Sequence, residues 1–478
     1  MAGTLEELFG LEDHGTDVRT EILAGITTFL TMSYIVVLNP AILTAFPDDN
    51  TPGGIAISGY GPGEIFQMLA VVTILSSAVA MFVMAFYANR PFGLAPGLGL
   101  NAFFAITVVG VLGVPWQTAL AAIVVEGIIF IVLTAVGARE YIIKLFPEPV
   151  KFAVGAGIGL FLAIIGLQAM GIVVDDPATL VGTGQIASDP VAILSVVGLF
   201  LTFVLYAAGL RGSIIVGILL TTLVGALATF LGLVEPGVLA TDAVRNGGFD
   251  ASRLASAQYD ITPLAGAFLT GFGNVEAFSF ALIVFTFFFV DFFDTAGTLV
   301  GVGQAGGFLD ENGDFPDIDK PLMADAVGTT VGGMLGTSTV TTFIESATGV
   351  EEGGRTGLTA LVVAVLFLAS LAVVPLASAI PLYASHIALV VVAVLMLRNV
   401  VDIQWDDFAH AVPAGLTIMV MPFTYSIAYG IAAGIISYPI VKTAQGEFDD
   451  VLVGQWILAA AFVLYFVVRT GGVLSSAL

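Results

Sequence analysis

Two aspartates lie deep inside one of the most apolar stretches of the chain. Asp291 and Asp294 occur within FTFFFVDFFDTAGTLVG, where an ionised, unpaired carboxylate costs several kcal/mol if the stretch lies in a membrane. A spacing of three residues places both carboxylates on one face of a helix. One of them could accept a hydrogen bond from a ligand N–H while the other binds a proton or orients the ligand. The structural alternative is that either aspartate caps a helix or pairs with a neighbouring helix.

A third carboxylate and an amide occupy segments that are rich in helix-interrupting residues. Glu345 lies within GTSTVTTFIESATG at 336–349, and Asn101 ends the stretch GLAPGLGLN at 93–101. A carboxylate beside free backbone groups could accept two N–H bonds from a planar heterocycle, and an asparagine offers both a donor and an acceptor. The alternatives are a capping or loop-bracing role for Glu345 and a turn-stabilising role for Asn101.

The remaining chemistry-bearing residues favour no catalytic reaction. Glu126 and Asp325 are further acids in apolar stretches, and each is either functional or paired between helices. We expect His386 and His410 to have interfacial, structural roles. The chain contains no cysteine, which excludes disulfides, thiolate catalysis and cysteine metal sites. The sequence presents no nucleophile–base pair or metal-ligand cluster, so we expect neither an enzyme nor a metal or cofactor site.

The composition predicts that lipid surrounds most of the chain. Hydrophobic residues make up 58% of the 478 positions and charged residues only 10%, a ratio from which no water-soluble surface could be built. The net charge of -24, from 37 acidic and 13 basic residues, argues against nucleic acid as a partner. Acidic, lysine-poor loops at 310–319 and 447–450 indicate a salt-rich habitat, in which strong screening tolerates their self-repulsion.

Apolar runs predict an all-α polytopic membrane protein with about fourteen transmembrane segments in two sets of seven. Each run is about 20 residues long, enough to cross a hydrocarbon core of roughly 30 Å. The first set covers 18–43, 65–88, 92–110, 114–137, 150–173, 190–208 and 212–233. The second covers 276–303, 321–337, 339–353, 356–377, 381–400, 406–423 and 425–443. A further apolar stretch at 451–468 either spans the membrane or lies along its surface.

The distribution of lysine and arginine predicts a cytoplasmic N-terminus. With that orientation ten basic residues, among them Arg19, Arg139 and Lys144, fall on the cytoplasmic side, and Arg245 and Arg253 fall outside. Because seven is odd, the second set of spans starts from the opposite face. A structural repeat between the two sets is therefore inverted, which is typical of secondary transporters.

The third segment of each set breaks the helical pattern. The stretch at 93–101 holds three glycines and a proline, which disfavour a continuous helix. The stretch at 336–349 is rich in threonine and serine, and its β-branched threonines favour an extended backbone. Unwound backbone at membrane depth is tolerated only beside protein or a watery cavity. Interrupted segments at matching positions are therefore the best sequence indication of a transport site.

Four stretches, taken in order, resemble the second nucleobase and cation symporter family, in its AzgA-like branch of adenine, guanine and hypoxanthine permeases. They are EILAGITTFLTMSYIVVLNP at 21–40, GLAPGLGLNAFF at 93–104, DFFDTAGTLVGV at 291–302 and GTSTVTTFIESATGVEEGGRTGLTA at 336–360. The resemblance covers nearly the whole chain and implies two inverted seven-segment repeats divided into core and gate domains. It implies core parts at 1–140 and 241–378 and gate parts at 141–240 and 379–478, and it makes a homodimer plausible.

The resemblance also implies a site between the third, eighth and tenth segments. Asn101 corresponds to the polar residue of the third segment, Asp291 and Asp294 to the acids of the eighth, and Glu345 to the acid of the tenth. We therefore expect Glu345, Asn101 and one aspartate, preferably Asp291, to bind a purine base, and the other aspartate to carry a proton.

The function expected from these residues is import of adenine, guanine or hypoxanthine across the cell membrane by proton symport with alternating access. Sodium is the alternative coupling ion in a salt-rich habitat. The alternative functions are a uracil or xanthine permease, an anion exchanger of the sulfate-transporter type on the same architecture, and an ion channel that uses buried acids. Acids without a central lysine or arginine argue against the anion exchanger.

Overall fold

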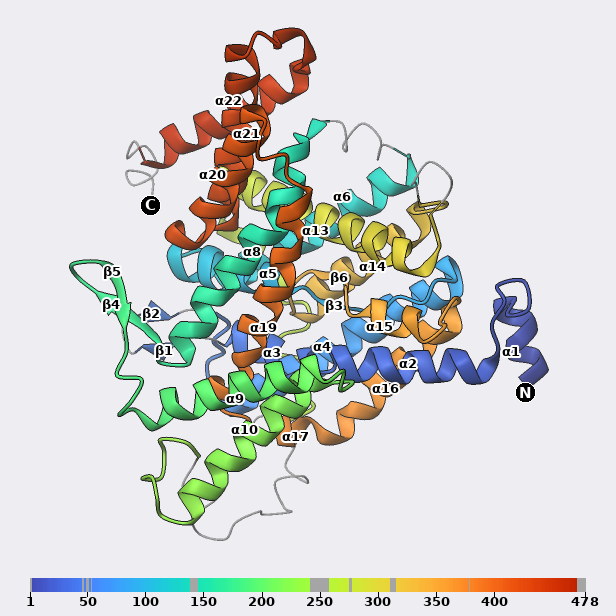
Figure 1. Cartoon of the computed structure of the whole chain (residues 1–478), viewed down its shortest axis with the longest axis vertical. Coiled ribbons are helices and arrows are strands. Elements are labelled where there is room, and N and C mark those ends of the chain that lie inside the picture. Colours follow the sequence, from blue (N-terminus) through green and yellow to red (C-terminus); the bar gives the residue numbers. More distant parts are fainter. Residues whose placement is uncertain are drawn as a thin grey trace. The chain divides into compact units, whose positions relative to one another are not determined.

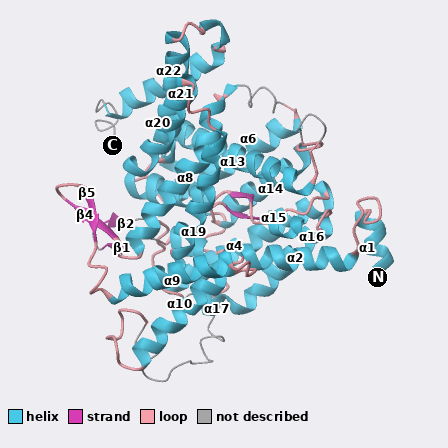
Figure 2. Ribbon diagram, viewed as in Figure 1, coloured by secondary structure: helices cyan, strands magenta, loops and turns pink. Residues whose placement is uncertain are grey.

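The protein is helical apart from short two-stranded sheets (Figures 1 and 2). The computed structural model describes residues 2–44, 47–48, 51–52, 54–137, 145–240, 258–274, 277–309, 315–377 and 379–470. Within these ranges nine helices are long and apolar enough to cross a membrane. They are Val18–Leu43, Pro62–Ala88, Trp116–Ala135, Glu148–Ala169, Pro190–Ala207, Ser213–Phe230, Ser279–Leu299, Gly357–Ala377 and Ile427–Ala444. The chain is thus a multi-pass membrane protein, as its composition predicts.

Helices occur at all fourteen predicted spans. The first set contains α2 (Val18–Met32), α3 (Ile35–Leu43), α4 (Pro62–Val83), η1 (Met84–Ala88), α5 (Leu98–Ala102), η2 (Phe103–Val111), α6 (Trp116–Ala135), α8 (Glu148–Ala169), α9 (Pro190–Ala207) and α10 (Ser213–Phe230). The second contains α13 (Ala277–Gly306), α14 (Asp319–Leu335), α15 (Ser346–Glu351), α16 (Gly357–Ser370), η4 (Leu371–Val373), α17 (Val374–Ala377), α18 (Leu382–Ser385), α19 (Ile387–Met396), η5 (Leu397–Asp402), α20 (Phe408–Thr424) and α21 (Ile427–Ala444).

Smaller elements complete the described part of the chain. They are α1 (Ala2–Phe9), β1 (Pro47–Asp48), β2 (Thr51–Pro52), β4 (Val173–Asp176), β5 (Leu180–Thr183), η3 (Ala267–Asn274), η6 (Phe448–Asp450) and α22 (Val453–Thr470). The stretch at 451–468 is therefore helical, and whether it spans the membrane stays a prediction.

The two broken segments contain the predicted extended stretches, and these pair with each other. Strand β3 (Leu94–Pro96) runs antiparallel to β6 (Val340–Thr342), with Ala95 opposite Thr341. The pairing continues at both ends, because Gly97 N donates to Thr339 O at 3.0 Å and Phe343 N donates to Gly93 O at 3.0 Å. These bonds satisfy backbone groups that a bilayer could not.

A glycine allows this close approach. A Cβ at Gly97 would lie 2.6 Å from Thr341 Cγ2, well inside van der Waals contact, so a larger residue would push β3 and β6 apart. Strands β3 and β6 contact α4 and α14 respectively, and Figure 1 shows the pair among these helices.

The helices around the two strands pack reciprocally. Helix α6 of the first set packs on α14 of the second, and α16 of the second packs on α4 of the first. Likewise α13 packs on α6 while α16 packs on α2, and α4 and α14 contact each other. Exchanging the two sets, with α2 for α13, α4 for α14 and α6 for α16, therefore reproduces the same contacts.

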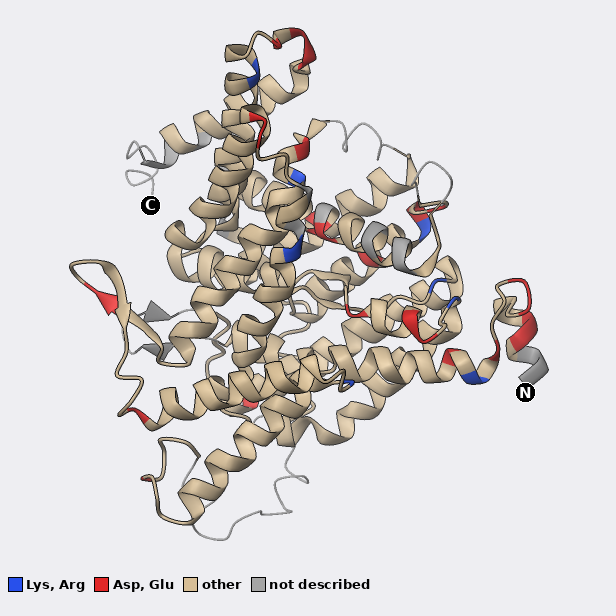
Figure 3. Cartoon of the chain, in the orientation of Figure 1, with Lys and Arg blue, Asp and Glu red and all other residues tan. Residues whose placement is uncertain are grey.

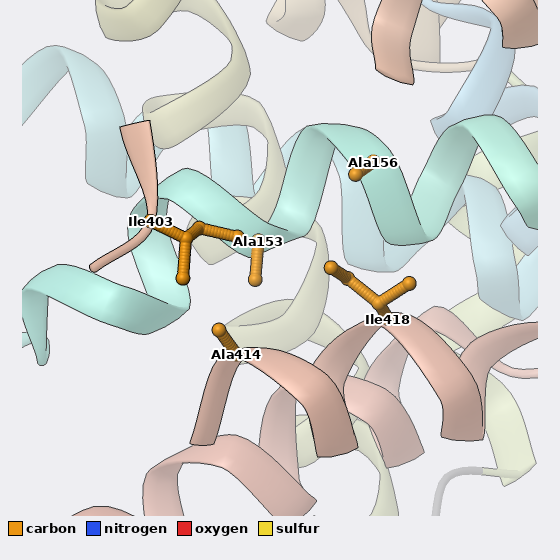
Figure 4. Packing of buried hydrophobic residues seen from close by; sticks show 5 residues of the cluster. All are labelled: Ala153, Ala156, Ile403, Ala414 and Ile418. Carbon is orange, nitrogen blue, oxygen red and sulfur yellow. The ribbon is translucent and has the colours of Figure 1, made fainter. Parts of the chain in front are cut away.

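The chain divides into two compact units. Unit 1 contains Met1–Ala135 and Ile165–Val391, and unit 2 contains Val136–Ile164 and Val392–Leu478. All residues discussed as site candidates belong to unit 1. In unit 2, α8, α20 and the end of η5 bury a small apolar cluster (Figure 4), whose members are Ala153, Ala156, Ile403, Ala414 and Ile418. The assignment of segments to core and gate domains stays a prediction.

Charged residues lie mostly at helix ends and in loops, and long helical stretches carry none (Figure 3). Arg139, Lys144, Arg245 and Arg253, which enter the prediction of orientation, lie outside the described residues, as do residues 310–314 of the acidic loop. The cytoplasmic N-terminus therefore stays a prediction.

Candidate functional site

Glu345 lies directly after the paired strands, at the position that precedes α15. Its Oε1 accepts a hydrogen bond of 2.6 Å from the hydroxyl of Tyr34. Tyr34 is fully buried and stands between α2 and α3, where the first segment is interrupted. A donor held at a fixed point orients the carboxylate. Through this contact the interruption of the first segment lies at the same site as the interruptions of the third and tenth segments.

Sequence reasoning missed Tyr34. A tyrosine inside TMSYIVVLNP is most often a packing residue or an interfacial anchor. The available signal was its position beside Ser33 and before Asn39 and Pro40, which together weaken a continuous helix.

Asp291 and Asp294 lie on one helix, as predicted, but have different neighbours. Asp294 is partly buried and interacts electrostatically with Glu345. Asp291 is fully buried, and its Oδ2 lies 3.1 Å from Thr329 Oγ1 on α14, within hydrogen-bond distance. Asp294 is thus the aspartate on the Glu345 side, and Asp291 is turned toward α14.

Asn101 is fully buried on α5, five residues after the end of β3. Its Nδ2 donates to Pro96 O at 3.4 Å, and its Oδ1 has no hydrogen-bond partner within the part of the chain that the structure describes. A buried amide oxygen without a donor is costly. Asn101 can therefore offer an acceptor to an N–H group of a ligand.

A network of threonines connects the acids to β6. Thr329 Oγ1 lies 2.9 Å from Val340 O and accepts from Val340 N at 3.2 Å. Thr295 Oγ1 donates to Asp325 Oδ1 at 2.8 Å and lies 2.5 Å from Thr341 Oγ1. The contacts of these threonines were not predicted from the sequence, because threonine is common in membrane helices and its partners are set by helix packing.

Within the part of the chain that the structure describes, no basic residue pairs with the acids of this region. Among the ion pairs of the described residues, none joins Asp291, Asp294 or Glu345 to a lysine or arginine. The described residues also contain no group of three His, Cys, Asp or Glu that could hold a metal ion. Such a site can accept hydrogen bonds from N–H groups and bind protons, whereas an anion would meet like charge. The fold and this site define a polytopic membrane transporter.

Comparison with known proteins shows the family. The family model named Xan_ur_permease, described as "Permease family", matches residues 19–433. The chain is 39% identical to the adenine permease AdeQ of Escherichia coli over 97% of this chain and 96% of that protein. It is 37% identical to the guanine/hypoxanthine permease PbuG of Bacillus subtilis over 97% and 99%. The chain belongs to this permease family, the nucleobase and cation symporter-2 family with its AzgA-like branch, and is a transporter rather than an enzyme.

A solved structure has a similar fold. The transmembrane domain of the cyanobacterial bicarbonate transporter BicA matches with a TM-score of 0.54 at 16% identity, over 87% of this chain and 97% of that chain. At this identity the likeness concerns the fold alone. The family predicted from the sequence motifs is confirmed by the family model and the relatives. The roles of individual site residues stay predictions.

Proposed function

We propose that the protein imports purine nucleobases, adenine, guanine or hypoxanthine, across the cell membrane by proton symport with alternating access. Two kinds of observation support this. The relatives AdeQ and PbuG, named for adenine and for guanine and hypoxanthine, align over almost their whole length. The observation that carries the proposal is the Glu345 carboxylate, held by Tyr34 beside the paired strands and suited to accept N–H groups from a planar base.

Glu345, Asn101 and Asp294 are the proposed base-binding residues. Tyr34 occupies Oε1 of Glu345, so Oε2 is the oxygen that accepts from the base. Adenine, guanine and hypoxanthine share an imidazole-ring N–H but differ at C6, where adenine has an amino group and the others a carbonyl. A carboxylate that accepts the shared N–H, with Asn101 adapting as donor or acceptor, serves all three.

This assignment departs from the sequence-based preference for Asp291 as the base-binding aspartate. Asp294 interacts electrostatically with Glu345, whereas Asp291 contacts Thr329, which favours Asp294 at the base and Asp291 at the coupling proton. Sodium is the alternative coupling ion.

The proposed cycle uses two inverted seven-segment repeats. The reciprocal packing of α2, α4 and α6 with α16, α14 and α13, together with the antiparallel β3–β6 pair, supports a two-fold relation between the sets. A core containing the site would move against a gate, exposing one site to each side in turn. A cytoplasmic N-terminus and a homodimer complete the proposal.

Uptake of radiolabelled bases into a transport-deficient host tests this function. Adenine, guanine, hypoxanthine, xanthine, uracil and sulfate are compared for the native chain and Glu345→Ala at equal surface expression. The proposal predicts saturable uptake of one or more purines that Glu345→Ala abolishes. Uptake of sulfate or uracil alone would refute it in favour of an anion exchanger or a pyrimidine permease, and unsaturable conductance would favour a channel.

A further inference from the structure

Helix α6 brings a third carboxyl group to the two aspartates that lie beyond the base site. Helix α6 packs against both α13 and α14. The carboxyl of Glu126 on α6 interacts electrostatically with those of Asp325 on α14 and Asp291 on α13. All three side chains are fully buried. These three residues are called the carboxyl cluster below.

Close contacts around Glu126 fix its position. A Cβ on the next residue, Gly127, would lie 2.4 Å from Thr330 Oγ1 of α14, so the two helices approach at van der Waals distance there. One turn further along α6, the ring of Phe130 lies 5.6 Å from that of Phe292, the residue after Asp291. Glu126 is therefore held between α13 and α14.

Four oxygens of the carboxyl cluster receive no hydrogen bond from a donor among the described residues, namely both oxygens of Glu126, Asp291 Oδ1 and Asp325 Oδ2. None of the ion pairs among the described residues brings a cation to the cluster. Asp294 is the other ionisable group that acts on Asp291 and Asp325, and η2 and η3, which also pack on α6, carry no ionisable residue. Three unpaired negative charges at membrane depth would each cost several kcal/mol. A proton shared between two carboxyls removes a charge and creates a hydrogen bond.

The contacts of Thr329 are compatible with a proton on Asp291. Thr329 has one hydroxyl hydrogen but lies 2.9 Å from Val340 O and 3.1 Å from Asp291 Oδ2, both of them acceptors. If that hydrogen is donated to Val340 O, the contact with Asp291 is a hydrogen bond only when Asp291 Oδ2 carries the proton.

Two threonines link the cluster to β6 by crossed paths. Asp291 on α13 contacts Thr329 on α14, which holds Val340. Conversely, Asp325 on α14 accepts from Thr295 on α13, which contacts Thr341. Strand β6 ends three residues before Glu345, so these threonines connect the cluster to the strand beside the proposed base-binding carboxylate.

We propose that Glu126 is a proton-binding residue of the transport cycle, sharing the coupling proton with Asp291 and Asp325, and that Thr329 and Thr295 transmit the charge of this cluster to β6. The inference rests on the proposed proton symport. A proton taken up with each base removes one negative charge from the cluster and favours both threonine contacts with β6. Release of that proton to the cytoplasm restores the charge, and the repulsion among the carboxylates then weakens those contacts and the base site.

Purified protein in liposomes tests the role of Glu126. An inward proton gradient of one pH unit drives about tenfold accumulation of base by a one-to-one symporter, and counterflow measures exchange of base without net proton movement. Glu126→Gln, which keeps the size but cannot titrate, should lose accumulation and substrate-induced proton uptake while counterflow stays within about threefold of native. Glu126→Asp should recover part of the accumulation, and the same change at the exposed Glu148, Glu148→Gln, should leave all three readouts unchanged.

The remaining outcomes would refute different parts of the proposal. Accumulation by Glu126→Gln equal to native refutes the inference alone, and equal loss of accumulation and counterflow in both Glu126 variants assigns Glu126 a structural role. A native protein that transports no base refutes the proposed function instead. Accumulation driven by a sodium gradient and indifferent to the pH step refutes proton coupling.

Neighbouring threonines provide a matched test of the links. Thr329→Val removes the hydroxyl between Asp291 and β6, whereas Thr330 donates to Ala326 O within its own helix. Thr329→Val should lower the number of protons moved per base, and Thr330→Val should not. The same ratio in both variants would refute the transmission through Thr329.

Discussion

Replacing Tyr34 with phenylalanine tests how the carboxylate of Glu345, the proposed base-binding group, is held in position. The change removes one hydroxyl, which donates a 2.6 Å hydrogen bond to Glu345 Oε1, and leaves a ring of the same shape in a fully buried position. A hydrogen bond to a charged group contributes about 1.5–3 kcal/mol. Since about 1.4 kcal/mol corresponds to a factor of ten in a binding constant, the full loss would weaken binding between about tenfold and a hundredfold.

We expect about a tenfold rise in KM for purine uptake, at the lower end of that range, because Glu345 keeps its own contact with the base. Freed from Tyr34, the carboxylate can rotate away from the orientation that the base requires, which makes it a poorer acceptor. The maximal rate at equal surface expression should change less than KM, since the hydroxyl contacts no element of the carboxyl cluster in the described structure.

Initial rates of radiolabelled purine uptake over a range of concentrations measure this effect. Tyr383→Phe is the matched control, because its hydroxyl is also buried but donates to a neutral backbone carbonyl, Leu239 O, at 3.0 Å. A KM for Tyr34→Phe within about twofold of native, or an equal rise in Tyr383→Phe, would refute the reasoning.

Three further substitutions test the framework around the site. Glu21→Ala leaves three backbone N–H groups at the start of α16 without their acceptor, and should lower stability by about 3 kcal/mol or more, seen as a lower melting temperature in detergent than for Glu21→Gln. Gly97→Val forces a side chain against Thr341 and should abolish purine uptake, which native uptake by this variant would contradict. The hydrogen bond from the Thr20 backbone N–H holds the pKa of Asp17 below its ordinary value. Native protein should therefore be more stable than Asp17→Ala above about pH 4, and this difference in stability should disappear as the pH falls below that value. A difference in stability that grows in acid would refute this prediction.

The broken segments could be predicted because their cause is local. Gly93, Pro96 and Gly97 weaken a helix wherever they occur, and the β-branched residues around Thr341 favour extended backbone. What the sequence could not supply is that the two stretches pair with each other and in which register. Pairing depends on how helices far apart in the chain pack, which has no local signature.

Partners of the acids were unpredictable for the same reason. Asp291 and Asp294 lie on one helix, as the sequence predicts, but only packing shows that Asp291 contacts Thr329 of α14 while Asp294 interacts with Glu345. Glu21 is a comparable case. Its position in the sequence predicts an acid that stabilises the first turn of its own helix. Its carboxylate instead accepts hydrogen bonds from the backbone N–H groups of Arg355, Thr356 and Thr359 at the start of α16.

The most direct measurement is an experimental structure of the native protein with the purine that it transports. We expect the base to lie beside the β3–β6 pair, with a ring N–H within hydrogen-bond distance of the Glu345 carboxylate and a polar edge at Asn101. A base bound elsewhere, with Glu345 still held by Tyr34 and facing no ligand, would refute the proposed role of Glu345.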